Sequence, residues 1–451
     1  MFSLPFSSLI PRSVKRRGFL AGCLLALLPY SANALPLERP FIWASAEERP
    51  AILGKIESEG WAQSLYESLK ERADRAVAAH QESRLDYLRE LPLVWPEGEE
   101  AHPRFPYIRN DRPGNPGHQH RRTLMTYIQD AVDCGVLYYL TEDPAYARSA
   151  ADFLATAVLA LGEMTPDDNR FNGGWIYPED HLKESRIFAA QFPLIYDFIH
   201  PFLVEGGKVM NVVTGEETDF PMAQAQEVFR TYVHLAINRG IIDANWPVLE
   251  SSSLVHNTLA LEDPAERRTY LPYYLERNVP EQDSLRKVAS SYEKPGDMWP
   301  ESLGYSRHVT KFSVYLMTLL DRIYPDLKLG RKYPNIAYSL NGTHYLEFPN
   351  GDVASFGDGK RRSGPMYRAF EKALLLARLN DLPEQERYFA SLLQTGLSKG
   401  DYDRGKLQPR YYRANPYFTP LSLLWQQKDI GGKPREYPRY RTDTLPFAGI
   451  Y

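Results

Sequence analysis

Residues Arg122–Leu161 read RTLMTYIQDAVDCGVLYYLTEDPAYARSAADFLATAVLAL and contain two helical patterns joined by a short connection. Apolar residues recur every three or four positions on both sides of Thr141-Glu142-Asp143-Pro144, which is the period of an amphipathic helix. Such a short connection between two helical segments predicts that they pack as an antiparallel hairpin.

The same helical period recurs along most of the chain, whereas strand-like alternation is scarce. The predicted helices run from about Glu48 to Ala79, Arg122 to Leu140, Asp143 to Leu161, His181 to Phe202, Met222 to Asn238, Val248 to Leu261, Ser302 to Tyr324, Met366 to Leu379 and Glu384 to Leu397. No repeat of fixed short period is present, which argues against a solenoid. We therefore expect an all-α protein in which unequal helical hairpins form a ring.

The N-terminal segment has the features of an export signal. Lys15-Arg16-Arg17 precedes an apolar run at 19–28, and Ala32-Asn33-Ala34 offers a small-residue cleavage site. The paired arginines favour the twin-arginine route. We expect a signal peptide at 1–34, a periplasmic or secreted protein, and no membrane span, because a span needs about 20 apolar residues.

The charge balance limits the possible ligands. A formal net charge of −4 gives no general attraction to nucleic acid or to an anionic membrane. Two basic segments, His118-Gln119-His120-Arg121-Arg122 and Lys360-Arg361-Arg362, are candidates for binding an acidic sugar, since arginine forms paired hydrogen bonds with carboxylate or sulfate. Alternatively, each is a solvated loop. The substrate-binding candidates among them are His120, Arg121, Arg122 and Arg361.

One predicted helix carries a set of titratable side chains. Glu301, Tyr305 and His308 are spaced i, i+4 and i+7, within an arc of about 60° on a helix. A tyrosine serves as an acid or base only when its pKa of about 10 is lowered. The alternative is that Tyr305 packs in the core while Glu301 and His308 form a surface pair.

A second segment, Asp243–Asn257, opens another predicted helix. Asn245 is placed to cap it, because Pro247 suits the first turn. Capping is the ordinary structural role of such an asparagine. Trp246 and Glu250 follow it on the same helix.

These motifs together resemble the heparinase II/III-like polysaccharide lyases and their alginate lyase relatives. The resemblance rests on Asn245-Trp246 with Glu250 five residues after the Asn, followed by Gly296–Tyr305 with its Asp297, Glu301 and Ser302. Arg39–Trp43 and Asn350–Asp358 are similar to the start and the end of the toroid domain of that family. The resemblance covers nearly all of the chain after the signal, through loose motifs.

The resemblance implies a domain organisation. An (α/α) toroid would occupy 35–430, and 431–451 would be a tail at the point where the family continues into a β-sandwich. The expected fold is therefore an incomplete (α/α) toroid, with the C-terminal β-sandwich absent or truncated.

The resemblance also implies roles in β-elimination from a uronic-acid polysaccharide. Asn245 would neutralise the uronate carboxylate, and Tyr305 would remove or deliver a proton, with His308 and Glu301 beside it. Neutralisation matters because negative charge develops next to that carboxylate as the C5 proton leaves. Trp246 and Glu250 would contact the substrate.

Two departures from the family pattern affect these roles. Trp246 stands where many relatives have His, and the catalytic His that the sandwich domain supplies in several members has no counterpart here. The histidines that remain as replacements are His118, His120, His256 and His308.

Two other functions remain open at this point. A glycoside hydrolase on a similar toroid would need two carboxyl groups about 5 to 10 Å apart, such as Glu250 with Glu301 or Asp297. The third possibility is a non-catalytic carbohydrate-binding toroid. In each case the expected partner is an acidic polysaccharide or oligosaccharide. No metal-binding or phosphate-binding motif stands out, so we expect neither a metal nor a cofactor.

Overall fold

The structure is a computed structural model, and part of the chain is described. The described residues are 38–93, 116–166, 174–176 and 184–434, without 241, 243, 244, 349, 355, 358, 360 and 407–417; the side chains of 116–121, 418 and 419 are also left out. The expected signal peptide and most of the expected tail lie outside them. All elements below belong to the compact unit Glu38–Tyr451.

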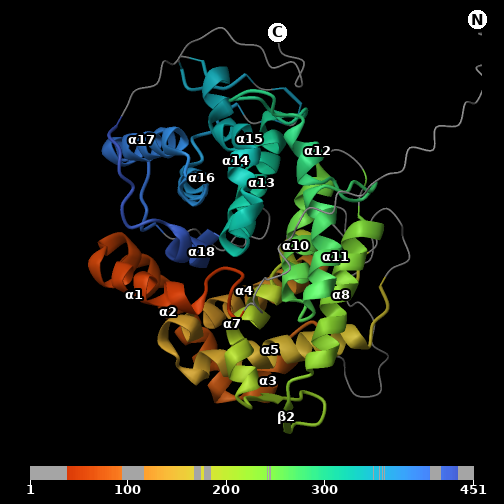
Figure 1. Ribbon diagram of the computed structural model, residues 1–451. Coiled ribbons are helices and arrows are strands. Elements are labelled where there is room, and N and C mark those ends of the chain that lie inside the picture. Colours follow the sequence, from red (N-terminus) through yellow and green to blue (C-terminus); the bar gives the residue numbers. More distant parts are fainter. Residues whose placement is uncertain are drawn as a thin grey trace, which may run out of the picture. The chain divides into compact units, whose positions relative to one another are not determined.

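Helices dominate the described chain, as expected for an all-α fold (Figure 1). The longer helices are α1 (Arg49–Ser58), α2 (Gly60–Glu82), α4 (Pro116–Thr141), α5 (Pro144–Gly162), α7 (Phe192–Val204), α8 (Met222–Asn238), α10 (Ser251–Ala260), α11 (Pro264–Leu275), α13 (Leu303–Ile323), α16 (Tyr367–Leu379), α17 (Pro383–Lys399) and α18 (Phe418–Trp425). Shorter elements are η1 (Ala46–Glu48), α3 (Arg84–Arg89), η2 (Glu184–Ala189), α9 (Trp246–Leu249), α12 (Leu285–Ala289), η3 (Pro325–Leu327), α14 (Leu329–Lys332), α15 (Pro334–Tyr338) and η4 (Ser339–Leu346). The strands β1 (Lys208–Met210) and β2 (Glu217–Asp219) form a small antiparallel hairpin.

The hairpin predicted at Thr141–Pro144 is confirmed, since α4 and α5 pack against each other. Asp143 caps α5 by accepting a hydrogen bond from the main-chain N of Ala145, and Pro144 occupies the first turn. Glu142 takes a positive φ of 61°, which reverses the chain. The turn sequence therefore sets both the end of one helix and the start of the next.

The inner helices contact one another in a closed circuit. The order is α2, α4, α7, α10, α13, α16, α18 and back to α2, while α1, α5, α8, α11 and α17 pack on this circuit. Side-chain bonds join the two ends of the circuit: Lys55 Nζ donates to the carbonyl oxygens of Leu424 at 3.1 Å and Gln426 at 2.9 Å. The described helices thus form the ring of hairpins that the sequence predicts.

Buried polar contacts anchor the start of the ring. Asp197 on α7 accepts hydrogen bonds from Arg39 Nη1 at 2.8 Å and from the main-chain N of Phe41 and Ile42 at 2.9 and 2.7 Å. These three bonds satisfy a carboxylate that has no exposed surface. The segment Arg39–Trp43 is therefore fixed to the ring core.

His256 belongs to this buried framework, which overturns its candidacy as a replacement catalytic group. Its Nδ1 lies 2.6 Å from Ala190 O, and its Nε2 lies 2.7 Å from the hydroxyl of Tyr315. Burial lowers the pKa of His256 to about 4, so the imidazole is neutral at physiological pH. A fully buried ring with both nitrogens bonded positions helices rather than substrate.

Several predicted helices have different boundaries in the structure. The helix predicted for Glu48–Ala79 is interrupted at Glu59, whose φ of −117° and ψ of 114° are extended. In the described part of the segment predicted from His181, the π-helical turn η2 precedes α7. The sequence patterns missed α3, α11, α12 and α18, which are short or lack a strong apolar face.

One helical stretch, Glu184–Val204, is long and apolar enough to cross a membrane by length and composition. It is 83% buried inside the protein, as is usual for a core helix. It contains η2 and α7, and α7 belongs to the inner circuit.

Candidate functional site

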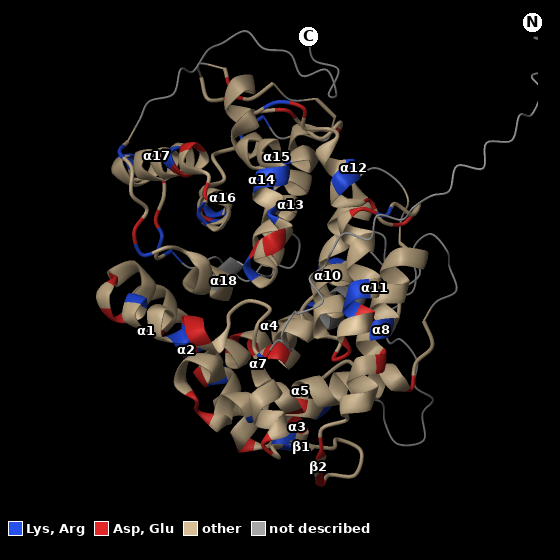
Figure 2. Cartoon of the chain, in the orientation of Figure 1, with Lys and Arg blue, Asp and Glu red and all other residues tan. Residues whose placement is uncertain are grey.

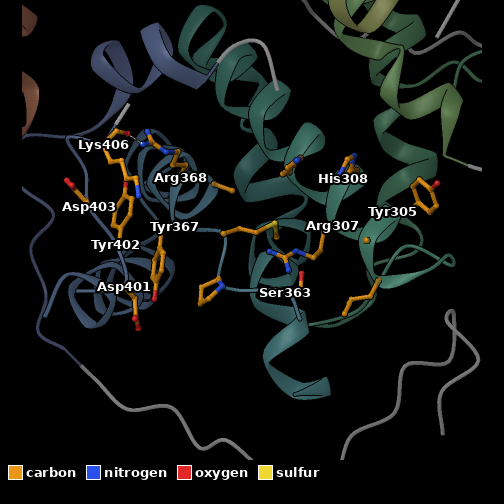
Figure 3. A pocket seen from close by; sticks show the side chains of 16 residues that line it. Tyr305, Arg307, His308, Ser363, Tyr367, Arg368, Asp401, Tyr402, Asp403 and Lys406 are labelled. Carbon is orange, nitrogen blue, oxygen red and sulfur yellow. Dashed lines mark hydrogen bonds between the residues drawn. The ribbon is translucent and has the colours of Figure 1, made fainter. Parts of the chain in front are cut away.

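A pocket of about 720 Å³ lies between α13 and α16 and is also lined by the segment 401–406. Its lining residues come from three stretches of the chain. They are Leu303, Gly304, Tyr305, Arg307, His308, Lys311, Ser363, Pro365, Met366, Tyr367, Arg368, Ala369, Asp401, Tyr402, Asp403 and Lys406. Figure 3 shows ten of them by name.

The α13 wall is positively charged. Tyr305, Arg307, His308 and Lys311 all line the pocket, while the opposite face of the helix is apolar and buried from Val309 onward. Residues three and four apart lie on one side of a helix, so this wall follows from the helical period. In Figure 3, Arg307 points toward Ser363, and Tyr305 points away from the opposite wall.

The opposite wall is aromatic and partly acidic. The rings of Tyr367 and Tyr402 stack with centroids 5.0 Å apart and planes 16° apart (Figure 3). Gly396 leaves room for Tyr367, since a Cβ there would lie 2.3 Å from its ring. Asp401 and Asp403 are exposed on either side of Tyr402.

Tyr402 is itself held by a buried ion pair. Its hydroxyl donates to Glu371 Oε1 at 3.1 Å, and Arg404 Nε bonds the same oxygen at 2.8 Å. Arg404 also donates to the carbonyl of Gln427. The aromatic wall is therefore preorganised by contacts beneath it.

Burial and mutual repulsion shift the titration of the α13 wall. Burial lowers the pKa of Lys311 to about 7, and the nearby charges of Arg307 and Arg186 add to this effect. Burial, with Lys311 and Arg186 close by, lowers the pKa of His308 to about 3. At neutral pH, His308 is therefore uncharged and Lys311 is close to half-protonated.

Two further segments bring cations to the same place. Arg186 belongs to η2, and its charge acts on both His308 and Lys311. Lys372 on α16 is buried, and burial together with Arg368 and Lys311 brings its pKa to about 7 despite Glu371. Figure 2 shows Lys and Arg positions on both α13 and α16. The site is therefore an electropositive cluster built from η2, α13 and α16.

Two of the predicted catalytic residues meet in this pocket. Tyr305, which is 37% exposed, and His308 both line it. The predicted helical spacing with Glu301 is wrong, because α13 begins at Leu303 and Glu301 lies in a bend before it. The main-chain N of Trp299 donates to Ser306 Oγ, which ties the segment before the helix to α13, and Ser302 is the residue before the first turn.

Asn245, Trp246 and Glu250 do not line the pocket, although α9 packs against α13. Asn245 stands at the N-cap position of α9, but its side chain makes no capping bond, so the capping role is not observed. The side chain is fully buried, and neither amide atom has a hydrogen-bond partner among the described residues. Glu250 is also fully buried, close to Gly240.

Of the two basic segments predicted to be loops, the first is helical and the second is a loop outside the pocket. Helix α4 begins at Pro116, so His118–Arg122 forms its first turns; Arg122 is exposed, and the side chains of His120 and Arg121 lie outside the described set. Arg361 remains in a loop, 3.6 Å from Asp352. Neither Arg122 nor Arg361 lines the pocket.

Two of the motifs that carry the family resemblance, Gly296–Tyr305 and Asn350–Asp358, are close in space. Met298, Leu303 and Val353 form a buried apolar cluster, with Leu346 and Phe356 packed on it. The segment before α13 and the segment around 350–357 thus pack against each other at the N-terminal end of the helix that carries Tyr305.

The sequence patterns missed Arg186, Arg307, Lys311, Arg368 and Lys372. Arg307 and Lys311 were detectable, since they are spaced i and i+4 on the helix of Tyr305. The others were not, because Arg186 lies on η2 and Arg368 and Lys372 lie on α16, and no local sequence pattern joins these elements to α13. Among the side chains that the structure describes, no three His, Cys, Asp or Glu residues form a metal-binding group.

Comparisons with known proteins point to polysaccharide lyases. Residues 295–440 match the sequence profile of the family described as endo-acting ulvan lyase 2nd domain, and this range contains every residue that lines the pocket. The chain is also 25% identical, over 398 residues, to an endo-acting ulvan lyase from Formosa agariphila. That alignment covers 86% of this chain and 46% of the relative, so the chain spans about half the length of the relative.

Proposed function

We propose that this protein is a polysaccharide lyase that cleaves a uronic-acid-containing polysaccharide by β-elimination. The observation that carries the proposal is the electropositive pocket with Tyr305 and His308 on its wall, inside the segment that is similar to ulvan lyases. A cationic wall suits an acidic sugar, and a stacked tyrosine wall suits its ring.

The chemistry requires a base for the C5 proton, an acid for the C4 oxygen and donors for the carboxylate. Tyr305 is the proposed proton-transfer residue, because it is the exposed tyrosine on the cationic wall. Removal of the C5 proton forms the C4–C5 double bond, and the C4–O bond breaks with a proton delivered to the leaving oxygen. No water is added across the cleaved bond.

At a finer level, we propose membership of the heparinase II/III-like group and export to the periplasm or beyond. The first rests on the Asn245 and Tyr305 motifs with the ring of hairpins. The second rests on Lys15-Arg16-Arg17 and the apolar run after it. Asn245 and Glu301 remain candidates for supporting roles near α13.

The hydrolase alternative finds less support in the geometry. Glu250 and Asp297 are buried, and neither lines the pocket. Asp297 Oδ2 accepts a hydrogen bond from the main-chain N of Lys294 at 2.7 Å, which ties it to its own loop. A hydrolytic pair drawn from these carboxylates would therefore need a different cleft.

The test is the product formed from ulvan and from polyglucuronate. A lyase leaves a C4–C5 double bond conjugated with the carboxylate, so ultraviolet absorbance rises with each cleavage. Reducing ends without that absorbance would identify a hydrolase, and binding without either product would identify a non-catalytic carbohydrate-binding ring. Either result would overturn the proposal.

A further inference from the structure

The α13 wall of the pocket contains a guanidinium that the protein leaves incompletely bonded, that of Arg307. Arg307 Nη2 donates to the carbonyl of Gly364 at 2.6 Å, which fixes one end of the group. Its Nη1 is buried and has no hydrogen-bond partner among the described residues. A buried charged donor without an acceptor costs more than a neutral one, so such a group calls for an anion.

Further cations surround this guanidinium. Lys311 lies one helical turn further along α13 and lines the same pocket. Arg186 on η2 and Lys372 on α16 repel Lys311. These charges destabilise one another in the free protein, and an anion placed among them would remove that cost.

The acidic side chains of the pocket lie on its other wall. Asp401 and Asp403 are exposed at the rim that carries Tyr402. Glu371 acts electrostatically on Lys372, but its oxygens are engaged by Tyr402 and Arg404. The carboxylate of an acidic sugar in the pocket is therefore repelled by Asp401 and Asp403 at the rim and attracted to the cations of α13, while the sugar ring remains able to stack on the tyrosines.

We propose that Arg307 and Lys311 form the subsite for the carboxylate of the uronate whose C5 proton is removed. This inference rests on the proposed lyase function and replaces Asn245, which lies buried outside the pocket, as the group that neutralises this carboxylate. The planar guanidinium bonds one carboxylate edge, and the ammonium adds a point charge. Both groups stabilise the carboxylate more strongly as negative charge spreads into it during proton removal.

The test measures binding, so it does not depend on turnover. End-labelled oligomers of polyglucuronate, carboxyl-reduced polyglucuronate and dextran sulfate are titrated with the wild-type protein and with Arg307→Gln. Arg286→Gln is the matched control, since Arg286 is exposed on α12 and does not line the pocket. We expect Arg307→Gln to weaken polyglucuronate binding by about 10- to 100-fold, as expected for the loss of a charged hydrogen bond, and Arg286→Gln to leave it unchanged.

On carboxyl-reduced oligomer, wild type and Arg307→Gln should bind equally and weakly. The inference is overturned if Arg307→Gln binds polyglucuronate like the control, or if its loss occurs on dextran sulfate alone, which would identify a sulfate subsite. Should Arg307→Gln not fold, Lys311→Met gives the same comparison. If wild type forms unsaturated product while Arg307→Gln binds normally, the lyase proposal stands and this inference fails. If wild type forms no unsaturated product while Arg307→Gln binds polyglucuronate more weakly, the carboxylate subsite stands and the lyase proposal fails.

Discussion

The indole Nε1 of Trp425 donates a hydrogen bond to the main-chain oxygen of Trp43 at 2.7 Å, across 382 residues of sequence. Trp425 also stacks on Tyr315, and Arg322 lies over its ring at 5.2 Å. Because Tyr315 and Arg322 belong to α13, this seam supports the helix that carries the cationic wall. Ring closure and pocket geometry are therefore linked.

Lys55→Met should weaken the closure of the ring, because Lys55 bonds the carbonyl groups of Leu424 and Gln426 on either side of Trp425. The side chain would lose hydrogen bonds to two buried carbonyl groups, so we expect the free energy of unfolding to fall by about 2 to 3 kcal/mol. Lys70→Met is the control, because Lys70 forms an exposed pair with Asp74 worth less than about 1 kcal/mol. Urea denaturation measures both; equal effects of the two variants would show that the seam bonds contribute little.

Tyr305→Phe should reduce the rate of unsaturated-product formation by about 100-fold or more, as expected for the loss of a general acid or base. Binding of polyglucuronate should change little, since the ring stays in place. Tyr66→Phe on α2, outside the pocket, serves as the control. Unchanged activity of Tyr305→Phe would exclude this hydroxyl from the chemistry.

Asn245→Leu separates a functional role from a structural one. The substitution removes two buried polar atoms that lack partners among the described residues, so we expect the free energy of unfolding to rise by about 1 kcal/mol. If Asn245 supports catalysis from beneath α13, lyase activity should fall at the same time. A more stable variant with full activity would leave Asn245 without a functional role.

Lys311→Met should stabilise the free protein at pH 6. Below its folded-state pKa of about 7, Lys311 is protonated and repels Arg307 and Arg186, so removing the charge should add about 1 kcal/mol to the free energy of unfolding. The unfolded lysine keeps its proton up to about pH 10.4, so wild-type stability recovers between pH 7 and that value. The advantage of the variant should therefore shrink across this range. Thermal unfolding at pH 6, 8 and 10 measures the difference in stability between the variant and the wild type. A difference that grows with pH would contradict the lowered pKa of Lys311.

The helical fold was largely predictable because long amphipathic helices repeat at a fixed period. Helix α8 was predicted with its observed boundaries, and α5, α13 and α16 within one residue at each end. Short elements such as α12 and α14 escaped prediction, since tertiary contacts rather than periodicity stabilise them. The position of Glu301 was predicted wrongly for a related reason: the helical spacing was extended to residues before Ser302, whereas α13 begins at Leu303.

The site was predictable only where its residues share one helix. Tyr305 and His308 were found by spacing, and the same spacing would have added Arg307 and Lys311. Arg186 and Lys372 join them through the packing of helices that are distant in sequence, which no local pattern encodes. The buried state of Asn245 was equally invisible, because its sequence context fits an ordinary helix cap.

The bond between Trp43 and Trp425 has a consequence for the order of the helices along the chain. The two ends of the described circuit lie side by side, so an engineered loop would join them over a short distance. The chain would then tolerate a cut at another turn, because every pair of neighbouring helices would stay in contact. The exposed turn at Glu142 and Asp143 is such a place. A circularly permuted protein cut there would keep α13, α16 and the 401–406 segment within one uninterrupted stretch, so the architecture of the ring is separable from the linear order in which it is encoded.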